Sequence, residues 1–581
     1  MQFAQSEGSA VVDGVPVFFA ARGEGPCAGG ITFRVGMVDE SPRWRGVSHL
    51  VEHLALAPLA GTSSHHNGET TIDTTGFHVQ GSAAEVVEFL GTVCTPLSSL
   101  AMQDLDREKS VLRAEAARRS RHVTESLAIY RFGARSYART SLPEWGLHDL
   151  DPDDIQWWAH HYFTRGNAVC WIVADELPAD LRLPLPEGSR QPAPPPTSAL
   201  AQTPAYYAAG SGLIAWSGVV ERSTAAAVLG AMLQRDLFRS LRTEAGLSYD
   251  VSALYQPRSG GLGDLVLSAD ALEENQDAAL DTFLHGLARL QLGQLSSEDL
   301  EAVRQERLEM YGRPGIDRLM LGSRVYDTLV GYPAKSVAEL VAELQDLTLD
   351  DVTDAGKRTY ETGLLRVPAG RDAEDAGFVR APDTSPTGLD GQSFPAYESP
   401  ATSMTVGPTG VSWSNGSQYA TVPYADCEAL ILYPDGGRRL VGGDGMNVAV
   451  EPTLYEGLGT AIATIDASVS PSAQVRVPRS AEEVPQVDHA GLEQRRQLQR
   501  LEHQRKPAVR VATAILTVLF VLGWIVIGLL GITAGALLAD GDSDGWAALV
   551  CTLGFIGLLI FGHVRFHRAR HGRPVSRRLR S

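Results

Sequence analysis

The chain has little cysteine: five residues in 581, namely Cys27, Cys94, Cys170, Cys427 and Cys551. They are scattered without pair spacing, which argues against a disulfide framework and for reducing surroundings. The first 21 residues lack the basic start of a secretory signal, so we expect the body of the protein to stay in the cytoplasm.

Basic residues are also fewer than acidic residues: the chain has 50 Lys and Arg against 69 Asp and Glu, which gives a net charge of −19. The positive charge gathers after residue 491, so the rest of the chain is more acidic still. An acidic body disfavours nucleic acid as a partner, because binding to phosphates depends on Lys and Arg.

What the sequence does contain is a run of two histidines and a glutamate: His49, Glu52 and His53, within G-V-S-H-L-V-E-H at residues 46–53. Residues three and four apart share one face of a helix, so both imidazoles could reach one ion with the carboxylate beside them. H-x-x-E-H is the inverted zinc-binding motif, and it favours peptide hydrolysis by activated water. A helix with partly buried histidines is the alternative, because the residues between them are largely apolar.

Catalytic zinc usually has three protein ligands, and the segment D-R-E-K-S-V-L-R-A-E-A at residues 106–116 offers a third. Glu108 and Glu115 are seven apart, almost two helical turns, so they lie on one face about 10 Å apart and only one of them can bind the ion. Taken alone, the segment is also typical of an ordinary solvated helix.

Together these segments resemble the insulinase, pitrilysin and mitochondrial processing peptidase family of zinc metallopeptidases. The resemblance implies that His49, His53 and Glu115 bind one Zn²⁺ per chain. It implies that Glu52 is the general base and that Glu108 is an accessory catalytic residue.

The segment N-G-E-T-T-I-D-T-T-G-F at residues 67–77 is similar to the substrate-binding strand of that family. The resemblance implies that Asn67, Thr70 and Thr75 bind substrate. An exposed strand edge holds an extended peptide by main-chain hydrogen bonds, and residues 67–80 are the candidate edge.

A second motif, R-T-E-A-G-L-S-Y at residues 242–249, resembles R-x-x-x-G-L-x-Y in the C-terminal domain of the family. Arg242 and Tyr249 are then expected to bind substrate and to stabilise the developing oxyanion. By itself, an Arg before a Gly-terminated helix with a Tyr starting a strand also fits a structural role.

Residues 295–301 echo residues 100–106, which indicates an internal repeat, and the second copy has no H-x-x-E-H. Relatives enclose substrate between two such pairs of units. We therefore expect a homodimer, or a heterodimer with a related peptidase-type chain, in which Arg242 and Tyr249 come from the partner.

The expected fold class is α+β, with sheets covered by helices. Proline-rich stretches separate the units. The expected domains are a zinc-bearing α+β domain (1–185), a degenerate α+β domain (199–372), a small β-rich domain (401–470), a basic linker (471–510), two transmembrane helices (511–563) and a basic tail (564–581). The β-rich region resembles bacterial pleckstrin-homology-like domains, with an ordinary β spacer as the equal alternative.

Residues 511–539 and 546–562 are long apolar runs that predict a helical hairpin in contact with membrane lipid. Arg and Lys flank the hairpin on both sides and are absent from the turn between the runs. The positive-inside rule then predicts a protein that crosses the cell membrane twice, with its peptidase domains and both termini in the cytoplasm.

The sequence therefore predicts a membrane-anchored zinc endopeptidase that hydrolyses short or unfolded peptides. Two other functions stay open. One is a non-catalytic scaffold subunit of a peptidase heterodimer, and the other is a membrane-tethered binding module with a structural zinc site. A structural site needs a fourth protein ligand, which His65 or His66 would have to supply.

Overall fold

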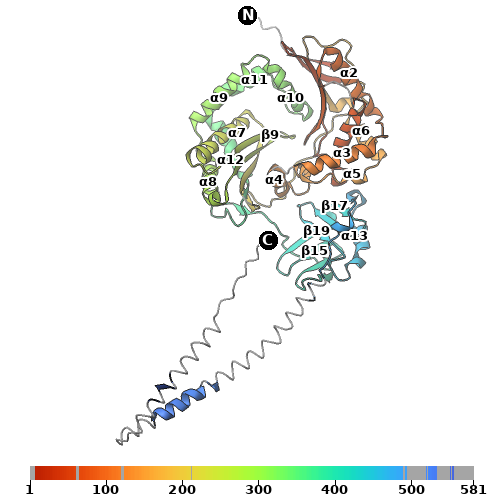
Figure 1. The fold of residues 1–581 in the computed structure, drawn as a ribbon. Helices are drawn as coiled ribbons and strands as arrows, with labels where there is room; N and C mark the ends of the chain where they lie inside the picture. Colours follow the sequence, from red (N-terminus) through yellow and green to blue (C-terminus); the bar gives the residue numbers. More distant parts are fainter. Residues whose placement is uncertain are drawn as a thin grey trace. The chain divides into compact units, whose positions relative to one another are not determined.

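The computed structural model describes residues 7–59, 65–119, 123–210 and 212–488, together with residues 491, 493, 518–519, 521–532, 550, 553–554 and 556. The chain divides into two compact units, Met1–Gln486 and Val487–Ser581. The helices and strands named below all belong to the first unit (Figure 1).

The first half of this unit is built on a six-stranded sheet in the order β1-β2-β6-β3-β5-β4. Its strands are β1 (Glu7–Val12), β2 (Val15–Ala20), β3 (Cys27–Phe33), β4 (His65–Thr70), β5 (Thr75–Gly81) and β6 (Ala168–Val173). β2 and β6 run parallel, and the other neighbouring pairs are antiparallel. Among the described strands β4 lies at the edge of the sheet, and an edge strand is a position where another chain can pair.

Helices of the first half cover this sheet and fill its core. They are α1 (Val47–Leu56), α2 (Ala83–Cys94), α3 (Leu105–Arg118), α5 (Gly146–Asp149) and α6 (Pro152–Tyr162), whereas α4 (Val123–Phe132) contributes no residue to this core. α2 begins at a capping box, in which the Ser82 side chain accepts from the Glu85 N–H and the Glu85 carboxylate accepts from the Ser82 N–H. Leu50 of α1, Val86 of α2 and Ile155 of α6 are fully or almost fully buried in the shared core.

The second half repeats this plan, with a sheet in the order β12-β7-β11-β8-β10-β9. Its strands are β7 (Ala205–Ala208), β8 (Leu213–Glu221), β9 (Val251–Pro257), β10 (Leu262–Asp270), β11 (Leu364–Val367) and β12 (Val379–Arg380). Its helices are α7 (Thr224–Leu237), α8 (Gln276–Leu292), α9 (Ser297–Tyr311), α10 (Ile316–Leu329), α11 (Val337–Asp346) and α12 (Leu349–Glu361). In each half the edge strand, β4 or β9, follows the first long helix, α1 or α7, which agrees with the internal repeat in the sequence.

Each half also contributes a helix that packs against the sheet of the other half. Leu321 of α10 packs against Ala20 and Val173 of the first sheet, and Leu127 of α4 packs against strand residues of the second sheet. Each sheet therefore buries apolar surface against a helix of the other half, and Figure 1 shows α4 beside the second half. This exchange fixes how the two halves face each other.

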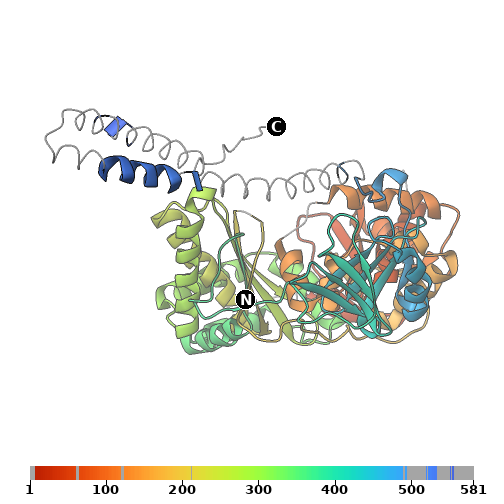
Figure 2. The same ribbon diagram turned by 90° about the horizontal axis from the view of Figure 1, so that it is seen from below.

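A β-rich region follows, with two four-stranded sheets in the orders β13-β14-β15-β16 and β19-β18-β17-β20. The strands are β13 (Gln392–Pro395), β14 (Ser403–Val406), β15 (Gly410–Ser414), β16 (Tyr419–Pro423), β17 (Cys427–Leu432), β18 (Arg438–Gly442), β19 (Asn447–Val450) and β20 (Gln474–Arg476), with helix α13 at Ile462–Ser468. We call this region, from β13 to β20, the β-rich domain. It packs against the first half through Ile431 and Val475, which share a core with Leu142. Figure 2 shows the β-rich domain beside the first half. The resemblance to pleckstrin-homology-like domains stays a prediction.

The hairpin predicted at residues 511–563 lies largely outside the described residues. Within the described part, no helix has both the length and the apolar character needed to cross a bilayer. The predicted localisation as a two-span cell-membrane protein with cytoplasmic peptidase domains rested on hydropathy and on the positions of Lys and Arg, and this finding contradicts it.

Candidate metal centre

Helix α1 carries the two histidines of the motif. Its apolar residues Leu50, Val51 and Leu54 are buried in the core of the first half, so His49 and His53 lie on the opposite face. Gly46 precedes the helix with φ of 96°, and a Cβ there would come within 2.9 Å of the Leu147 side chain. The sequence at the start of α1 therefore has both a conformational and a packing reason for glycine.

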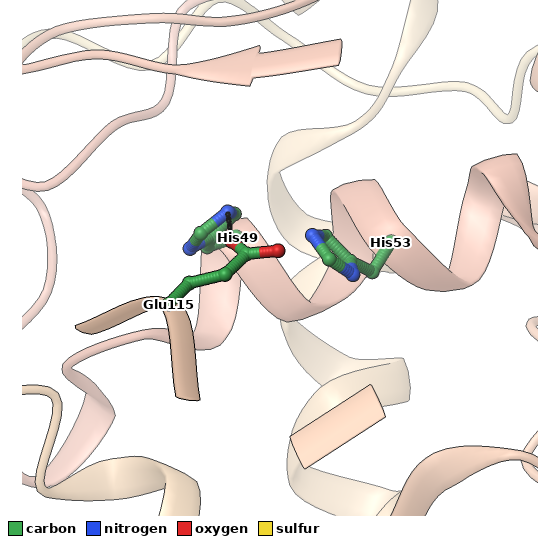
Figure 3. Close-up of side chains that lie close together, drawn as sticks. All are labelled: His49, His53 and Glu115. Atoms are coloured by element: carbon green, nitrogen blue, oxygen red, sulfur yellow. Dashed lines mark ion pairs between the residues drawn. The ribbon is translucent and has the colours of Figure 1, made fainter. Parts of the chain in front are cut away.

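His49, His53 and Glu115 lie together, as Figure 3 shows. One ligand atom of each side chain lies within 4.8 Å of the others. The Nε2 atom of His49 is 3.8 Å from the nearer carboxylate oxygen of Glu115, which reaches across from α3. The two histidine side chains are 16% and 19% exposed and Glu115 is 51% exposed, so the site is open to solvent on the Glu115 side.

This arrangement fits a zinc ion in its chemistry. Two imidazoles and one carboxylate are a common ligand set of catalytic zinc, and a tetrahedral ion would hold these atoms roughly 3.3–3.6 Å apart. Glu115 is half exposed and can move the remaining distance. Among the described residues, the group contains no fourth His, Cys or acidic ligand, so His65 and His66 do not complete a closed structural site.

Glu108 lies behind His53. Its carboxylate accepts a hydrogen bond of 3.0 Å from Nδ1 of His53 and a second of 2.9 Å from Arg107. These two donors outweigh burial, which acts in the opposite direction, and lower the pKa of Glu108. The contact occupies Nδ1 of His53 and leaves Nε2 for another partner. The catalytic role expected for Glu108 stays a prediction.

Glu52 lies on α1 beneath β4. It is 5% exposed, and its carboxylate accepts a hydrogen bond of 3.0 Å from the Thr70 hydroxyl. Gly68 passes so close that a Cβ there would come within 2.5 Å of the carboxylate. Burial raises the pKa of Glu52, although the neighbouring His49 and the Thr70 hydroxyl act against the rise. A carboxylate with a raised pKa is suited to accept a proton near neutral pH.

The other two residues of the predicted substrate strand have different surroundings. Asn67 is exposed on edge strand β4, where it pairs in register with His78 of β5. Thr75 is completely buried and donates a hydrogen bond of 2.9 Å to the Val35 carbonyl. The structure therefore gives Asn67 access to a ligand, whereas Thr75 anchors the β4–β5 hairpin and does not face solvent.

Arg242 and Tyr249 lie together in the second half. Arg242 belongs to a π-helical turn, Phe238–Glu244, and its guanidinium is 5.0 Å from the centre of the Tyr249 ring. Tyr249 is 78% exposed, and its N–H donates to the Asp270 carboxylate. Among the described contacts, none joins either residue to His49, His53 or Glu115, so the structure pairs these two residues with each other and not with the candidate metal ligands.

One residue of the site was not predicted from the sequence: Glu144, whose carboxylate lies 3.6 Å from Nδ1 of His49. Burial acts to raise its pKa, but His49 and Arg45 outweigh burial, so the pKa of Glu144 is lowered. The converse holds for His49: burial acts to lower its pKa, but Glu144, Glu52 and Glu115 raise it. Glu144 stands alone between Pro143 and Trp145 without motif spacing, so only the fold brings it to the site.

The comparisons with known proteins agree with this architecture. A family model described as the peptidase M16 inactive domain matches residues 214–307, within the second half. A protease from Helicobacter pylori shares 15% identity with a TM-score of 0.53, over 62% of this chain and 99% of that chain. The chain has the peptidase M16 fold.

Other solved structures with the M16 fold are similar to the same extent. A peptidase M16 inactive domain from Pseudomonas fluorescens has 14% identity and a TM-score of 0.52, over 62% of this chain and 97% of that chain. A chain of complex III2 from Candida albicans has 13% identity and a TM-score of 0.51, over 62% and 94%. At such identities the likeness concerns the fold alone. No curated protein matches the chain.

These findings confirm the predicted mixed α+β fold with M16-like units. The matched family model describes the inactive domain, which agrees with the absence of H-x-x-E-H from the second half. It does not include His49, His53 or Glu115, so the family match concerns the half without the candidate metal ligands.

Proposed function

We propose that the chain is a zinc-dependent endopeptidase that binds one zinc ion through His49, His53 and Glu115. The observation that carries the proposal is that two imidazoles and a carboxylate, drawn from helices α1 and α3, converge within 4.8 Å beside the buried carboxylate of Glu52. Zinc, when bound, lowers the pKa of water and polarises a carbonyl group.

Glu52 is the general base of this proposal. It accepts a proton from the attacking water as the oxygen adds to the scissile carbonyl, and it then delivers that proton to the leaving amine. Thr70 holds the carboxylate by its hydrogen bond, and the close approach of Gly68 limits its movement. No covalent bond between the protein and the substrate is required.

The proposed substrate is a short or unfolded peptide that pairs with edge strand β4. The free backbone of an edge strand binds an extended peptide with little demand on its sequence. Asn67 is exposed on this strand and Thr70 lies beside Glu52, so a peptide paired with β4 would pass along the general base.

Glu52→Gln tests the general base. We expect the variant to keep its zinc while peptide turnover falls by about 10²–10⁴-fold, measured with a mixed peptide library and zinc analysis of the same sample. Glu88→Gln is the matched control, because Glu88 is an exposed acid on α2, outside the proposed substrate strand and the candidate ligands, and should leave turnover unchanged. Full turnover by Glu52→Gln would remove Glu52 from the mechanism, and zinc without any turnover by the wild type would favour a scaffold subunit.

We further propose that two chains, either identical or related, act together, so that Arg242 and Tyr249 of one serve the zinc site of the other. The exposure of Tyr249 and its pairing with Arg242, apart from the zinc ligands, support this arrangement. For the homodimer, mixing His49→Ala with Tyr249→Phe should restore turnover, because one of the two sites then has all its residues intact. Mixed chains that form dimers but recover no turnover would contradict exchange between identical chains.

A further inference from the structure

Glu144, which was not predicted from the sequence, has the burial and position of a residue that orients the His49 ring. Its side chain is only 6% exposed, and one carboxylate oxygen faces Nδ1 of His49 at 3.6 Å. The other oxygen is buried and has no hydrogen-bond partner in the described part of the protein. A buried carboxylate with an unused oxygen is costly to maintain, so a role for it is expected.

The two histidines are supported in the same way. Glu108 accepts a hydrogen bond from Nδ1 of His53 at 3.0 Å, and Glu144 faces Nδ1 of His49 at slightly more than hydrogen-bond length. A carboxylate at Nδ1 fixes the tautomer and the ring orientation and leaves Nε2 for the ion. A small rotation of the His49 ring toward Glu144 would complete the second contact.

The segment that carries Glu144 is held by the β-rich domain. Leu142 and Trp145, on either side of Glu144, pack in one cluster with Ile431 and Val475. Arg135, earlier in the same segment, pairs with acidic residues of the β-rich domain at 2.7 and 2.6 Å. The β-rich domain thus contacts the first half at the segment that carries Glu144.

We propose that Glu144 is a positioning residue for His49, and that the β-rich domain tightens the metal centre by holding Glu144 in place. The inference rests on the proposed zinc site and deepens it. In this proposal the β-rich domain has a structural role within the same chain, and that role does not depend on a ligand of the domain.

The first test measures zinc affinity by competition with a chelator in the full chain, with peptide turnover recorded separately. Glu144→Ala should weaken zinc binding about 10–100-fold, as loss of such a support commonly does, and Glu144→Gln should weaken it less because its carbonyl oxygen still accepts from Nδ1. Asp153→Asn is the control, because Asp153 is an exposed acid on α6 and should leave zinc affinity unchanged. Circular dichroism confirms that each variant is folded.

The second test uses two neighbours on β17 that face opposite ways. Ile431 packs toward Leu142 and the first half, whereas Leu430 packs in the core of the β-rich domain itself. Ile431→Ala should weaken zinc binding, and Leu430→Ala should not as long as the domain stays folded. In the Glu144→Ala background, Ile431→Ala should have no further effect, because the group through which it acts is absent.

The outcomes separate this inference from the proposed function. If the wild type binds one zinc and Glu144→Ala binds it within twofold of the wild type, Glu144 is not a positioning residue while the zinc site stands. If Ile431→Ala weakens zinc equally with and without Glu144, the β-rich domain does not act through Glu144. If the wild type binds no zinc, both the inference and the proposed function are wrong.

Discussion

Replacing Glu40 should loosen the start of the helix that carries the metal ligands. Glu40 is 1% exposed and forms an ion pair with Arg45, which is equally buried. The same carboxylate accepts hydrogen bonds from the backbone N–H groups of Gly46 and Ser48, at 2.9 and 2.8 Å, at the N-terminus of α1. Glu40 therefore satisfies one buried cation and two N–H groups that have no acceptor within the helix.

The magnitude follows from what Glu40→Gln leaves behind. The glutamine keeps the size and one acceptor oxygen but loses the charge, so the buried Arg45 loses its ion-pair partner and keeps neutral acceptors such as the Leu142 carbonyl, at 3.4 Å. Removing one partner of a buried ion pair costs about 3–5 kcal/mol of unfolding free energy. The amide group also directs donors at the helix N–H groups, which adds to the loss.

Hydrogen exchange of the α1 amides is the assay, because it reports local opening free energy without assuming that the whole chain unfolds in one step. We expect protection in α1 to fall by about 3 kcal/mol or more in Glu40→Gln, and zinc affinity to fall with it. Asp175→Asn is the control, since its pair with Arg22 is 58% and 43% exposed and solvent screens such a pair, so protection in α1 should not change. A change below about 1 kcal/mol in Glu40→Gln would refute the reasoning.

Three further predictions concern other parts of the protein. Thr70→Val removes the hydrogen bond to the candidate general base, and turnover should fall roughly 2–10-fold with zinc content unchanged; an unaltered rate would exclude that support. A hydrogen bond from Arg239 lowers the pKa of Asp299, so the stability that Asp299 contributes is present at neutral pH and lost as the pH falls through that lowered pKa. Asp299→Asn should therefore lower the melting temperature at pH 7, and the gap to the wild type should close in acid; a gap independent of pH would contradict this assignment. Burial raises the pKa of Cys170 to about 12, so its thiol should resist alkylation in the native protein, as peptide mass spectrometry can check, and rapid labelling would show that the core opens readily.

Local geometry explains why part of the candidate site could be predicted from the sequence. His49, Glu52 and His53 are separated by three and four residues, and helical spacing alone puts them on one side of α1. Glu115 required the resemblance to a known family, because the sequence by itself could not say which of Glu108 and Glu115 reaches the histidines. The structure brings Glu115 toward the candidate ion and Glu108 to the far side of the His53 ring.

The contacts that the sequence did not predict depend on long-range packing. Glu144 is far from His49 in the chain and reaches it because the segment around Trp145 folds back over α1 and the β-rich domain packs against it. The exchange of α4 and α10 between the halves likewise has no local pattern, since each helix buries its apolar face against the sheet of the other half. Hydropathy predicted two membrane spans, whereas the described residues contain no helix suited to cross a bilayer.

X-ray absorption at the zinc edge tests the central claim most directly, because it identifies the atoms around the ion without any assay of turnover. The account predicts one zinc per chain with two imidazole nitrogens at about 2.0–2.1 Å and a carboxylate oxygen at about 2.0–2.2 Å. The histidine signal should decrease in His53→Ala, and the oxygen shell should change in Glu115→Ala. A spectrum with sulfur ligands or with oxygen ligands alone, or a protein that retains no zinc after exposure to the ion, would contradict the account.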